Sequence, residues 1–266
     1  MKLRLLDYGA LTADVGWVIE AGGVSTHSDP SPLTQRRDYQ MLGALIEHPK
    51  HGVIIYEAGP APNWEDLWPQ PVKEVFGITR YAEENRLDNL LKKAGYELKD
   101  VGAIIIGHMH LDHAGGLEFF RGLDVPVYAH EEEIKYSFYA VATKQDFGAY
   151  LPHYIDSAFN WKPVYGDEVE LFEGITVYLT PGHTPGLMAL KVDLGSESYL
   201  FTSDTMFFKE NYYDERPPGW LIRDMGDWWR SLAKLKTIAV RHNCNVILGH
   251  DGDVFREHAK RGVIGG

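Results

Sequence analysis

Four potential metal ligands occur within six residues of this chain, in the segment His108-Met109-His110-Leu111-Asp112-His113. The segment follows an apolar run, residues 101–106, which is typical of a buried strand. Because side chains alternate along an extended chain, His108 and His110 should point to the same side. Asp112 and His113 fall where the chain turns into a pair of glycines. This spacing predicts two neighbouring sites for divalent metal ions.

A single histidine is more often a surface residue or a hydrogen-bonded core residue than a metal ligand. We interpret seven of the twelve histidines in this ordinary way: His27, His48, His51, His130, His153, His242 and His258. The cluster of four ligand-type residues is different, because burying them without partners would carry a large desolvation cost that a metal ion removes.

Three further ligand candidates each follow an apolar run that is typical of a strand. They are His183 after residues 175–179, Asp204 after residues 199–201, and His250 after residues 245–248. Loops at the ends of strands often carry functional residues, and the glycines and prolines around His183 fix the shape of its loop. Together with the first four, these residues supply enough ligands for a pair of metal ions.

The order of the motifs HMHLDH, PGHTPG, SD and GHD resembles the metallo-β-lactamase superfamily of hydrolases, over most of the chain to about Asp251. The resemblance implies two divalent metal ions. The implied ligands are His108, His110 and His183 for one ion, and Asp112, His113 and His250 for the other, with Asp204 bridging both. Flavodiiron relatives carry glutamate at the position of His110, so zinc is the expected metal. The same ligand types also accept manganese, iron or cobalt.

Within the superfamily, the chain is similar to the lactonases that open N-acyl-homoserine lactones, on the motifs HMHLDHAGG and PGHTPG and the segment Ser203-Asp204. Two positions differ from that pattern. The lactonases usually carry a tyrosine that contacts the substrate carbonyl where this chain has Phe207, and an aspartate where it has Glu57. Tyr212 and Tyr213 are the candidates to supply the missing hydroxyl.

The expected reaction is the hydrolysis of a lactone ring, with an N-acyl-homoserine lactone as the leading substrate (quorum quenching). Two divalent ions about 3.5–4 Å apart lower the pKa of a water between them and polarise a carbonyl group. Asp112 is the candidate to accept a proton and pass it to the leaving oxygen, and Asp204 is expected to hold the metal pair together.

Two alternatives stay open. The first is a hydrolase of the same fold that acts on a cyclic amide or carbamate, which Phe207 and a tryptophan-rich segment keep open. The second is a non-catalytic metal-binding module, against which the complete set of seven ligands argues.

The composition limits the class of protein and its partners. A net charge of −12 argues against a nucleic-acid partner, because binding phosphate backbones needs a basic face. The single cysteine, Cys244, excludes an intrachain disulfide and fits a reducing compartment. No apolar stretch approaches the length that spans a bilayer, so we expect no membrane partner and a cytoplasmic location. The length allows one domain over residues 1–266, and a homodimer is expected by resemblance alone.

Apolar patterns predict a mixed α/β fold in which two sheets carry helices on their outer faces, an αββα sandwich. Besides the strands named above, strands are expected at residues 2–8, 15–20, 41–47 and 52–57, and helices at residues 80–94 and 227–241. Thr79 and Gly95 are the expected start and stop signals of the first helix.

Two aromatic segments are expected near the substrate. Residues 59–76 contain Trp64 and Trp68, which we predict to line an apolar substrate pocket together with Phe207. The alternative, that these tryptophans cover a sheet edge or a subunit contact, is equally open. Residues 136–154 are predicted to form a helical excursion over the site.

Overall fold

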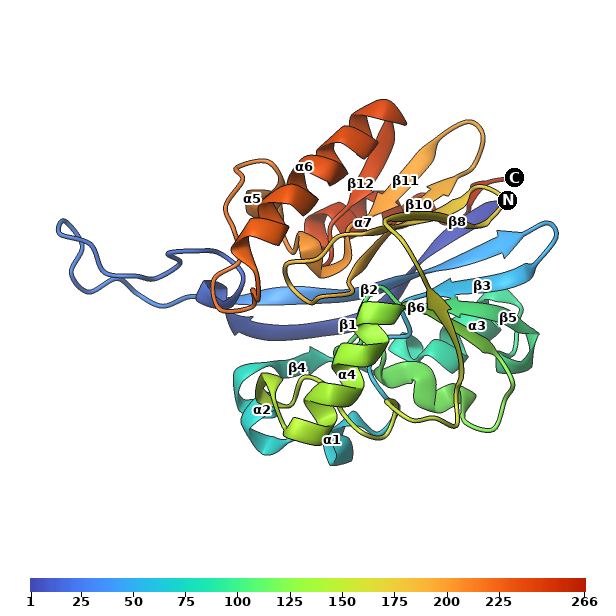
Figure 1. Cartoon of the computed structure of the whole chain (residues 1–266), viewed down its shortest axis with the longest axis horizontal. Coiled ribbons are helices and arrows are strands. Elements are labelled where there is room, and N and C mark those ends of the chain that lie inside the picture. Colours follow the sequence, from blue (N-terminus) through green and yellow to red (C-terminus); the bar gives the residue numbers. More distant parts are fainter.

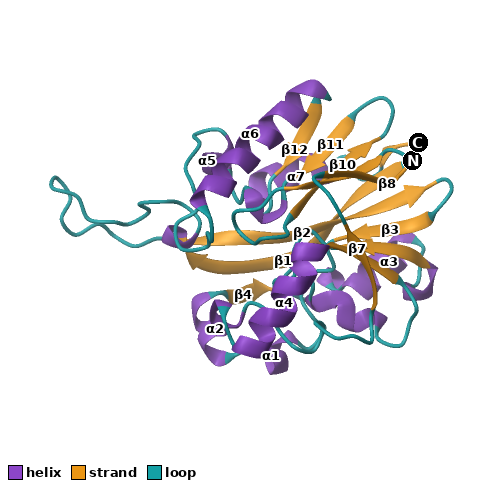
Figure 2. Cartoon of the chain, in the orientation of Figure 1, coloured by secondary structure: helices purple, strands orange, loops and turns teal.

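The computed structural model describes residues 1–266, apart from the side chain of Phe147. Its strands form an eight-stranded and a five-stranded sheet that pack face to face, with helices on both outer sides (Figure 1), and Figure 2 shows the same layers by type of element. The first sheet runs in the order β13 (Ile264–Gly265), β1 (Lys2–Asp14), β2 (Arg36–His48), β3 (Gly52–Tyr56), β5 (Val101–Ile105), β6 (Pro126–His130) and β7 (Asn160–Val164), with β4 (Gly77–Arg80) paired to β1. The second runs β12 (Cys244–Ile247), β11 (Ser198–Phe201), β10 (Met188–Asp193), β9 (Ile175–Leu179) and β8 (Glu168–Phe172). The predicted αββα sandwich is confirmed.

The helices divide between the two outer sides. They are α1 (Trp64–Leu67), α2 (Gln70–Val75), α3 (Leu87–Ala94), α4 (Glu131–Thr143), α5 (Lys209–Tyr212), α6 (Met225–Arg241) and α7 (Gly252–Ala259). Helices α1 to α4 lie beside the first sheet, and α6 packs against β12 of the second (Figure 1). Among the described residues, we find no helix with the length and apolar character that crossing a bilayer requires.

The central strands β3 and β5 of the first sheet are buried on both faces. In β3, Val53 and Ile55 belong to the core under the helices, whereas Ile54 and Tyr56 belong to the core shared with the second sheet. This alternation is the period-two pattern of a strand, and burial on both faces explains why β3 and β5 read as continuous apolar runs rather than as alternating ones.

The carboxyl ends of the strands bring distant segments to one edge. Strand β10 is antiparallel to both β9 and β11, and β11 is parallel to β12, so β9, β11 and β12 all end at the same edge of their sheet. The loop after β5 joins this edge through a hydrogen bond from Met188 N to Gly107 O of 2.8 Å. Four segments that are far apart in the sequence therefore meet here.

The predicted strand over residues 15–20 is wrong. Strand β1 continues to Asp14, whose side chain accepts a hydrogen bond from Gly16 N of 2.8 Å. Such a bond from an aspartate to the backbone two residues ahead favours a turn, and a 3-10 turn follows at Val15–Trp17.

Two predicted helices end where we expected but begin at different residues. Helix α3 ends at Gly95 as predicted, with φ of 94°, but it begins only at Leu87, because residues Gly77–Arg80 pair with β1 as β4. The Thr79 hydroxyl donates to Ala10 O (3.3 Å) instead of capping a helix. Helix α6 starts two residues early, at Met225, because the Asp224 side chain caps it.

The aromatic segment over residues 136–154 is helical only in part. Helix α4 begins earlier, at Glu131, and ends at Thr143, and a 3-10 turn follows at Asp146–Gly148. Phe147, one of the aromatic residues of this segment, has a side chain outside the described part of the structure.

Candidate metal centre and active-site cavity

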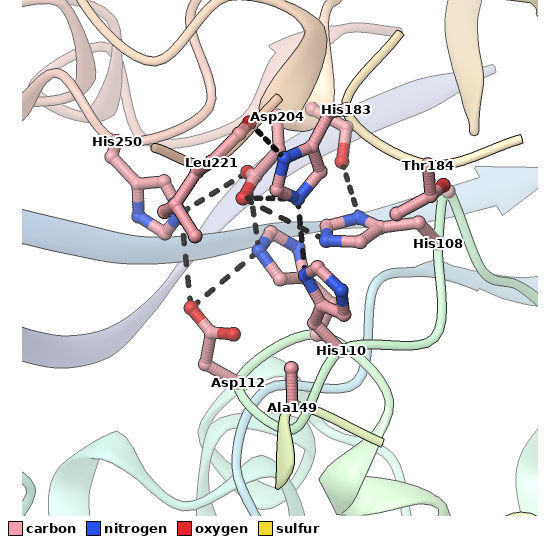
Figure 3. A network of polar contacts seen from close by, with 12 residues as sticks. His108, His110, Asp112, Ala149, His183, Thr184, Asp204, Leu221 and His250 are labelled. Carbon is pink, nitrogen blue, oxygen red and sulfur yellow. Dashed lines mark hydrogen bonds and ion pairs between the residues drawn. The ribbon is translucent and has the colours of Figure 1, made fainter. Parts of the chain in front are cut away.

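All seven predicted metal ligands lie together at one edge of the sandwich (Figure 3). Four of them come from the loop after β5, and one each from the ends of β9, β11 and β12. They form two groups, His108, His110, His183 and Asp204, and Asp112, His113 and His250, and the ligand atoms within each group lie within 4.8 Å of one another.

The first group has the spacing of a tetrahedral site. His110 Nδ1 lies 3.0 Å from His183 Nε2, and Asp204 Oδ2 lies 3.5 Å from that same nitrogen. His108 Nε2 lies 3.6 Å from Asp204 Oδ2. Four ligands about 2.0–2.1 Å from a central ion stand about 3.3 Å apart, so these distances match the edges of such a tetrahedron.

The second group has the same spacing and shares Asp204 with the first. Asp204 Oδ1 lies 3.2 Å from His113 Nε2 and 3.1 Å from His250 Nε2. Asp112 Oδ2 lies 3.5 Å and 3.7 Å from the same two nitrogens. Each oxygen of the Asp204 carboxylate therefore faces a different group, as a bridging ligand requires.

Several of these ligand atoms are buried and make no hydrogen bond in the protein, as expected for a site that binds a cation. His108 Nε2, His113 Nε2 and Asp204 Oδ1 are inaccessible to solvent and make no hydrogen bond. Leaving buried polar atoms unpaired is costly, and two divalent cations, one at each group, would satisfy all three. The nitrogen and carboxylate donors are also a set that zinc and similar divalent metals accept.

The protonation state of the first ligand group favours metal binding. Burial holds the pKa of His108 and of His110 well below the ordinary value, so both imidazoles are neutral and have a free lone pair. Burial alone would raise the pKa of Asp204, but the neighbouring imidazoles, His250 foremost, hold it well below its usual range. The first group thus presents neutral nitrogens. Burial alone would lower the pKa of His113 and of His250, but the Asp204 carboxylate raises both, so an ion at the second group would displace protons from these imidazoles.

Backbone carbonyls orient two of the imidazoles. His183 Nδ1 lies 2.8 Å from Leu221 O, and His250 Nδ1 lies 2.9 Å from Gln40 O (His183 and Leu221 in Figure 3). A carbonyl can only accept a hydrogen bond, so each Nδ1 carries the proton and each Nε2 is left free as a ligand.

Glu57 orients a ligand of each group, a role that the sequence alone did not indicate. Its Oε1 lies 3.3 Å from His113 Nδ1 and accepts a hydrogen bond from Ser203 Oγ (2.9 Å), which in turn lies 3.2 Å from His108 Nδ1. Gly107 N donates to the other carboxylate oxygen (3.1 Å). The departure from aspartate at this position therefore keeps a carboxylate beside the ligands.

An apolar cavity opens over the second ligand group. Its polar lining includes His110, Asp112, Asp204 and His250, and its apolar lining includes Leu11, Trp17, Tyr39, Val72, Phe76, Leu111, Phe207 and Leu221. A second, more polar hollow adjoins it at His110, His183 and Arg223. The arrangement can hold an apolar group beside a metal-activated centre.

Phe207 lines the cavity, but the other predicted substrate residues do not. Trp64 and Trp68 pack edge to face, with ring centroids 5.3 Å apart, within the core under the helices. Among the described residues, the aromatic wall beside Phe207 comes instead from Trp17, Tyr39 and Phe76, and the ring centroids of Trp17 and Phe76 are 5.1 Å apart. The aromatic content of residues 59–76 correctly predicted a segment beside the cavity, but Val72 and Phe76 line it rather than the two tryptophans.

The two tyrosines predicted to supply a hydroxyl also lie away from the cavity. Tyr212 is buried in the core shared by the sheets, and Tyr213 is exposed over 63% of its surface. Neither is among the described residues that line the cavity. The structure therefore places neither of these hydroxyls at the cavity that Phe207 lines.

Two packed sheets between layers of helices, with seven ligands arranged around two adjacent points, define a metal-dependent hydrolase of the αββα class. The family model described as "Metallo-beta-lactamase superfamily" matches residues 43–250, and the chain belongs to this superfamily. The family that we inferred from the motifs is thus confirmed.

Several relatives are N-acyl homoserine lactonases. An N-acyl homoserine lactonase of Bacillus sp is 32% identical over 206 residues, which are 76% of this chain and 78% of the relative. The lactonase AiiB of Agrobacterium fabrum is 25% identical over 96% of this chain and 95% of its own length. A crystal structure of Bacillus thuringiensis AiiA with N-decanoyl-L-homoserine at its active site has a TM-score of 0.80 and 25% identity, over 96% of this chain and 95% of that one.

Proposed function

We propose that this protein hydrolyses the ester bond of N-acyl-homoserine lactones by means of two divalent metal ions, with zinc as the metal. The observation that carries the proposal is the pair of ligand groups that share Asp204 beneath an apolar cavity. The relatives and the similar solved structure, several of which are lactonases, support the same substrate.

Different residues of the metal centre have different roles in the proposed reaction. When bound, the two metal ions supply Lewis acidity toward a carbonyl oxygen and a water of lowered pKa. Asp204 faces both ligand groups and fixes their separation. Asp112 both faces the second group and lines the cavity, so it is placed to take a proton and return it to the leaving alkoxide oxygen.

The apolar wall receives the acyl chain in this proposal. Leu11, Val72 and Phe76 lie on the wall, and burying a chain against them stabilises the complex by about 0.8 kcal/mol for each methylene removed from water. The polar ring of the substrate then stands at the ligands, where hydrolysis takes place.

The centre stabilises the carbonyl oxygen without a tyrosine from the cavity wall. Phe207 has no hydroxyl, and the Tyr39 hydroxyl already donates to Asp14 O (3.0 Å). Metal ions held by the two ligand groups would therefore supply most of the stabilisation of charge that develops on the carbonyl oxygen. This feature favours a second candidate function, the hydrolysis of a cyclic amide or carbamate with a flat ring that packs on Phe207.

A direct assay separates the two functions. The protein loaded with zinc is mixed with homoserine lactones of short and long acyl chain, with a cyclic carbamate and with an aryl lactam, and proton release is followed. Turnover of the homoserine lactones that a chelator abolishes supports the proposal. Turnover of the carbamate or lactam alone contradicts it and favours the second function.

Four further features are part of the proposal: one domain over residues 1–266, a homodimer, a cytoplasmic location, and no nucleic-acid or membrane partner. The molecular mass in solution, measured by light scattering, tests the dimer, and a mass of one chain would contradict it.

A further inference from the structure

Glu133 is a fully buried acid that accepts four hydrogen bonds. It lies in the first turn of α4 with 0% of its surface exposed. Its Oε1 accepts from Met109 N (2.8 Å) and from the Tyr150 hydroxyl (3.0 Å). Its Oε2 accepts from the Thr184 hydroxyl (2.6 Å) and from Gly186 N (3.2 Å). Four donors, and the helix N-terminus, compensate much of the cost of burying a carboxylate.

Three of the four partners, all except Tyr150, belong to the loops that carry one ligand group. Met109 lies between His108 and His110, and Thr184 directly follows His183. The Glu133 carboxylate therefore joins the two loops that supply all three histidines of the first group, although these loops are about 75 residues apart in the sequence, since the His183 and His110 contact spans 73 residues.

The contacts around Glu133 leave little freedom to these loops. At Gly186, an added Cβ would stand 2.0 Å from Glu133 N, so the PGHTPG loop touches the backbone of α4. The Tyr154 hydroxyl donates to Met109 O (2.9 Å), which holds the same peptide segment from its other side. The Tyr150 ring packs edge to face on His110 at 4.7 Å. Together these contacts fix where the three imidazoles converge.

The second ligand group is oriented by other residues. His113 contacts Glu57, and His250 contacts Gln40 O. Among the hydrogen bonds of the described residues, Glu133 accepts none from the loop of His250, and in the HMHLDH segment it accepts only from Met109, which lies between the two histidines of the first group. The influence of Glu133 is thus directed at one of the two metal positions.

We propose that Glu133 is a positioning residue that preorganises the first ligand group, His108, His110 and His183, for its metal ion, so that losing the carboxylate weakens this position selectively. The inference rests on the proposed dinuclear centre but not on the substrate. In Glu133→Gln, the amide NH2 would face hydrogen-bond donors at one of the two loops, because each carboxylate oxygen now accepts two bonds. Outer partners of metal ligands typically contribute 10- to 100-fold to affinity, and we expect a loss of about that size at the first position.

Metal binding tests this without any assay of turnover. Metal-free protein is titrated with Co²⁺, followed by calorimetry and by visible absorption, for wild type, Glu133→Gln and the matched control Glu132→Gln. Glu132 is the exposed neighbour on the same helix and pairs with Lys135. Wild type and the control should each bind two ions, with affinities that do not differ between the two proteins. Glu133→Gln should bind one ion as tightly as wild type does and the other about 10- to 100-fold more weakly.

Two more variants identify the weakened position. His250→Ala removes a ligand of the second group, so it should retain one tight ion, and Glu133→Gln combined with His250→Ala should retain none. Thr184→Val removes one donor and leaves the carboxylate, so it should weaken the same ion by a smaller factor even if Glu133→Gln folds poorly. Thr184→Ser keeps the hydroxyl and should bind like wild type.

The outcomes separate this inference from the proposed activity. Equal weakening of both ions in Glu133→Gln and in Thr184→Val, or no weakening in either, overturns the positioning role. A wild-type protein that binds no Co²⁺ contradicts the dinuclear centre and this inference with it. A wild-type protein that binds two ions but opens no lactone contradicts only the proposed substrate.

Discussion

Phe207 stacks on His250 with the ring planes 13° apart and the centroids at 5.7 Å, and it meets His183 edge-on at 5.3 Å. The ring therefore touches one imidazole from each ligand group and stands over the space between the two metal positions. Phe207 also lines the cavity, and its side chain offers no hydroxyl there.

Phe207→Tyr should raise kcat for homoserine lactones. The added hydroxyl would donate to the carbonyl oxygen as negative charge develops on it, and one such donor is typically worth about 10²-fold or more, so we expect an increase of at least about tenfold. Steady-state kinetics at saturating zinc measure the effect. Phe207→Leu, which loses the ring and gains no hydroxyl, is the control, and an unchanged kcat in Phe207→Tyr at full metal content would show that the ring does not face the carbonyl.

Asp204→Asn should lose both metal ions and turnover together. An amide offers one acceptor oxygen where the carboxylate faces both groups, and it removes the negative charge that four imidazoles surround. His110→Ala should lose turnover with the ion of the first group. Elemental analysis after gel filtration gives the metal content of each variant, and an active variant with two ions per chain would contradict the ligand assignment.

Chelation should lower the thermal stability of the protein as well as its activity. Because the ligands come from four distant segments, ion binding stabilises the folded state by about 4 kcal/mol when free metal exceeds Kd a thousandfold. Melting temperatures measured with and without a chelator, and after zinc is restored, check this. A melting temperature that does not respond to chelator in metal-loaded protein would mean that the centre holds no structural ion.

The metal centre could be predicted from the sequence because its signals are local. Each ligand follows an apolar strand directly, and four of them share one short segment, so strand period and spacing were sufficient. Strands β3 and β5 could be predicted for the same reason, since Ile54 and Ile55 are buried on opposite faces of the sheet and give a continuous apolar run, whereas β4, β6, β7 and β13 were not predicted. The strand predicted over residues 15–20 shows what the apolar pattern cannot reveal, because a single hydrogen bond from Gly16 N to the Asp14 side chain favours a turn there.

The surroundings of the centre could not be predicted because their contacts join distant positions. Glu57 bonds to Ser203 across 146 residues, and Glu133 bonds to Thr184 across 51. Trp68 lies between α1 and α2 and packs in the core, and nothing in the order of residues 59–76 says which of their side chains turn to the cavity. A glutamate in the first turn of a helix is an ordinary pattern, so Glu133 gave no signal of its own.

Acidification should destabilise the protein in part through His153. Burial lowers the pKa of His153 to about 4, so the folded state holds it neutral where the unfolded chain would be protonated. The unfolded state then binds the additional proton as the pH falls from about 6.5 to about 4, and stability is lost over that range. Urea unfolding between pH 7 and pH 4 should show a shallower decline for His153→Gln than for wild type, and parallel curves would contradict the burial of a neutral imidazole.

Phe76→Ala should reduce the preference for long acyl chains. Phe76 lies on the apolar wall and packs on Trp17, so removing its ring exposes the distal part of a long chain to water while leaving a short chain unaffected. A loss of about two buried methylenes corresponds to about 1.6 kcal/mol, or roughly 15-fold in kcat/KM, for the long-chain lactone alone. The ratio of kcat/KM for long and short lactones measures the effect, with the exposed Tyr213→Ala as the control. Equal losses for both chain lengths would place the acyl chain elsewhere, since a wall that contacts only the distal methylenes cannot act on a substrate that lacks them.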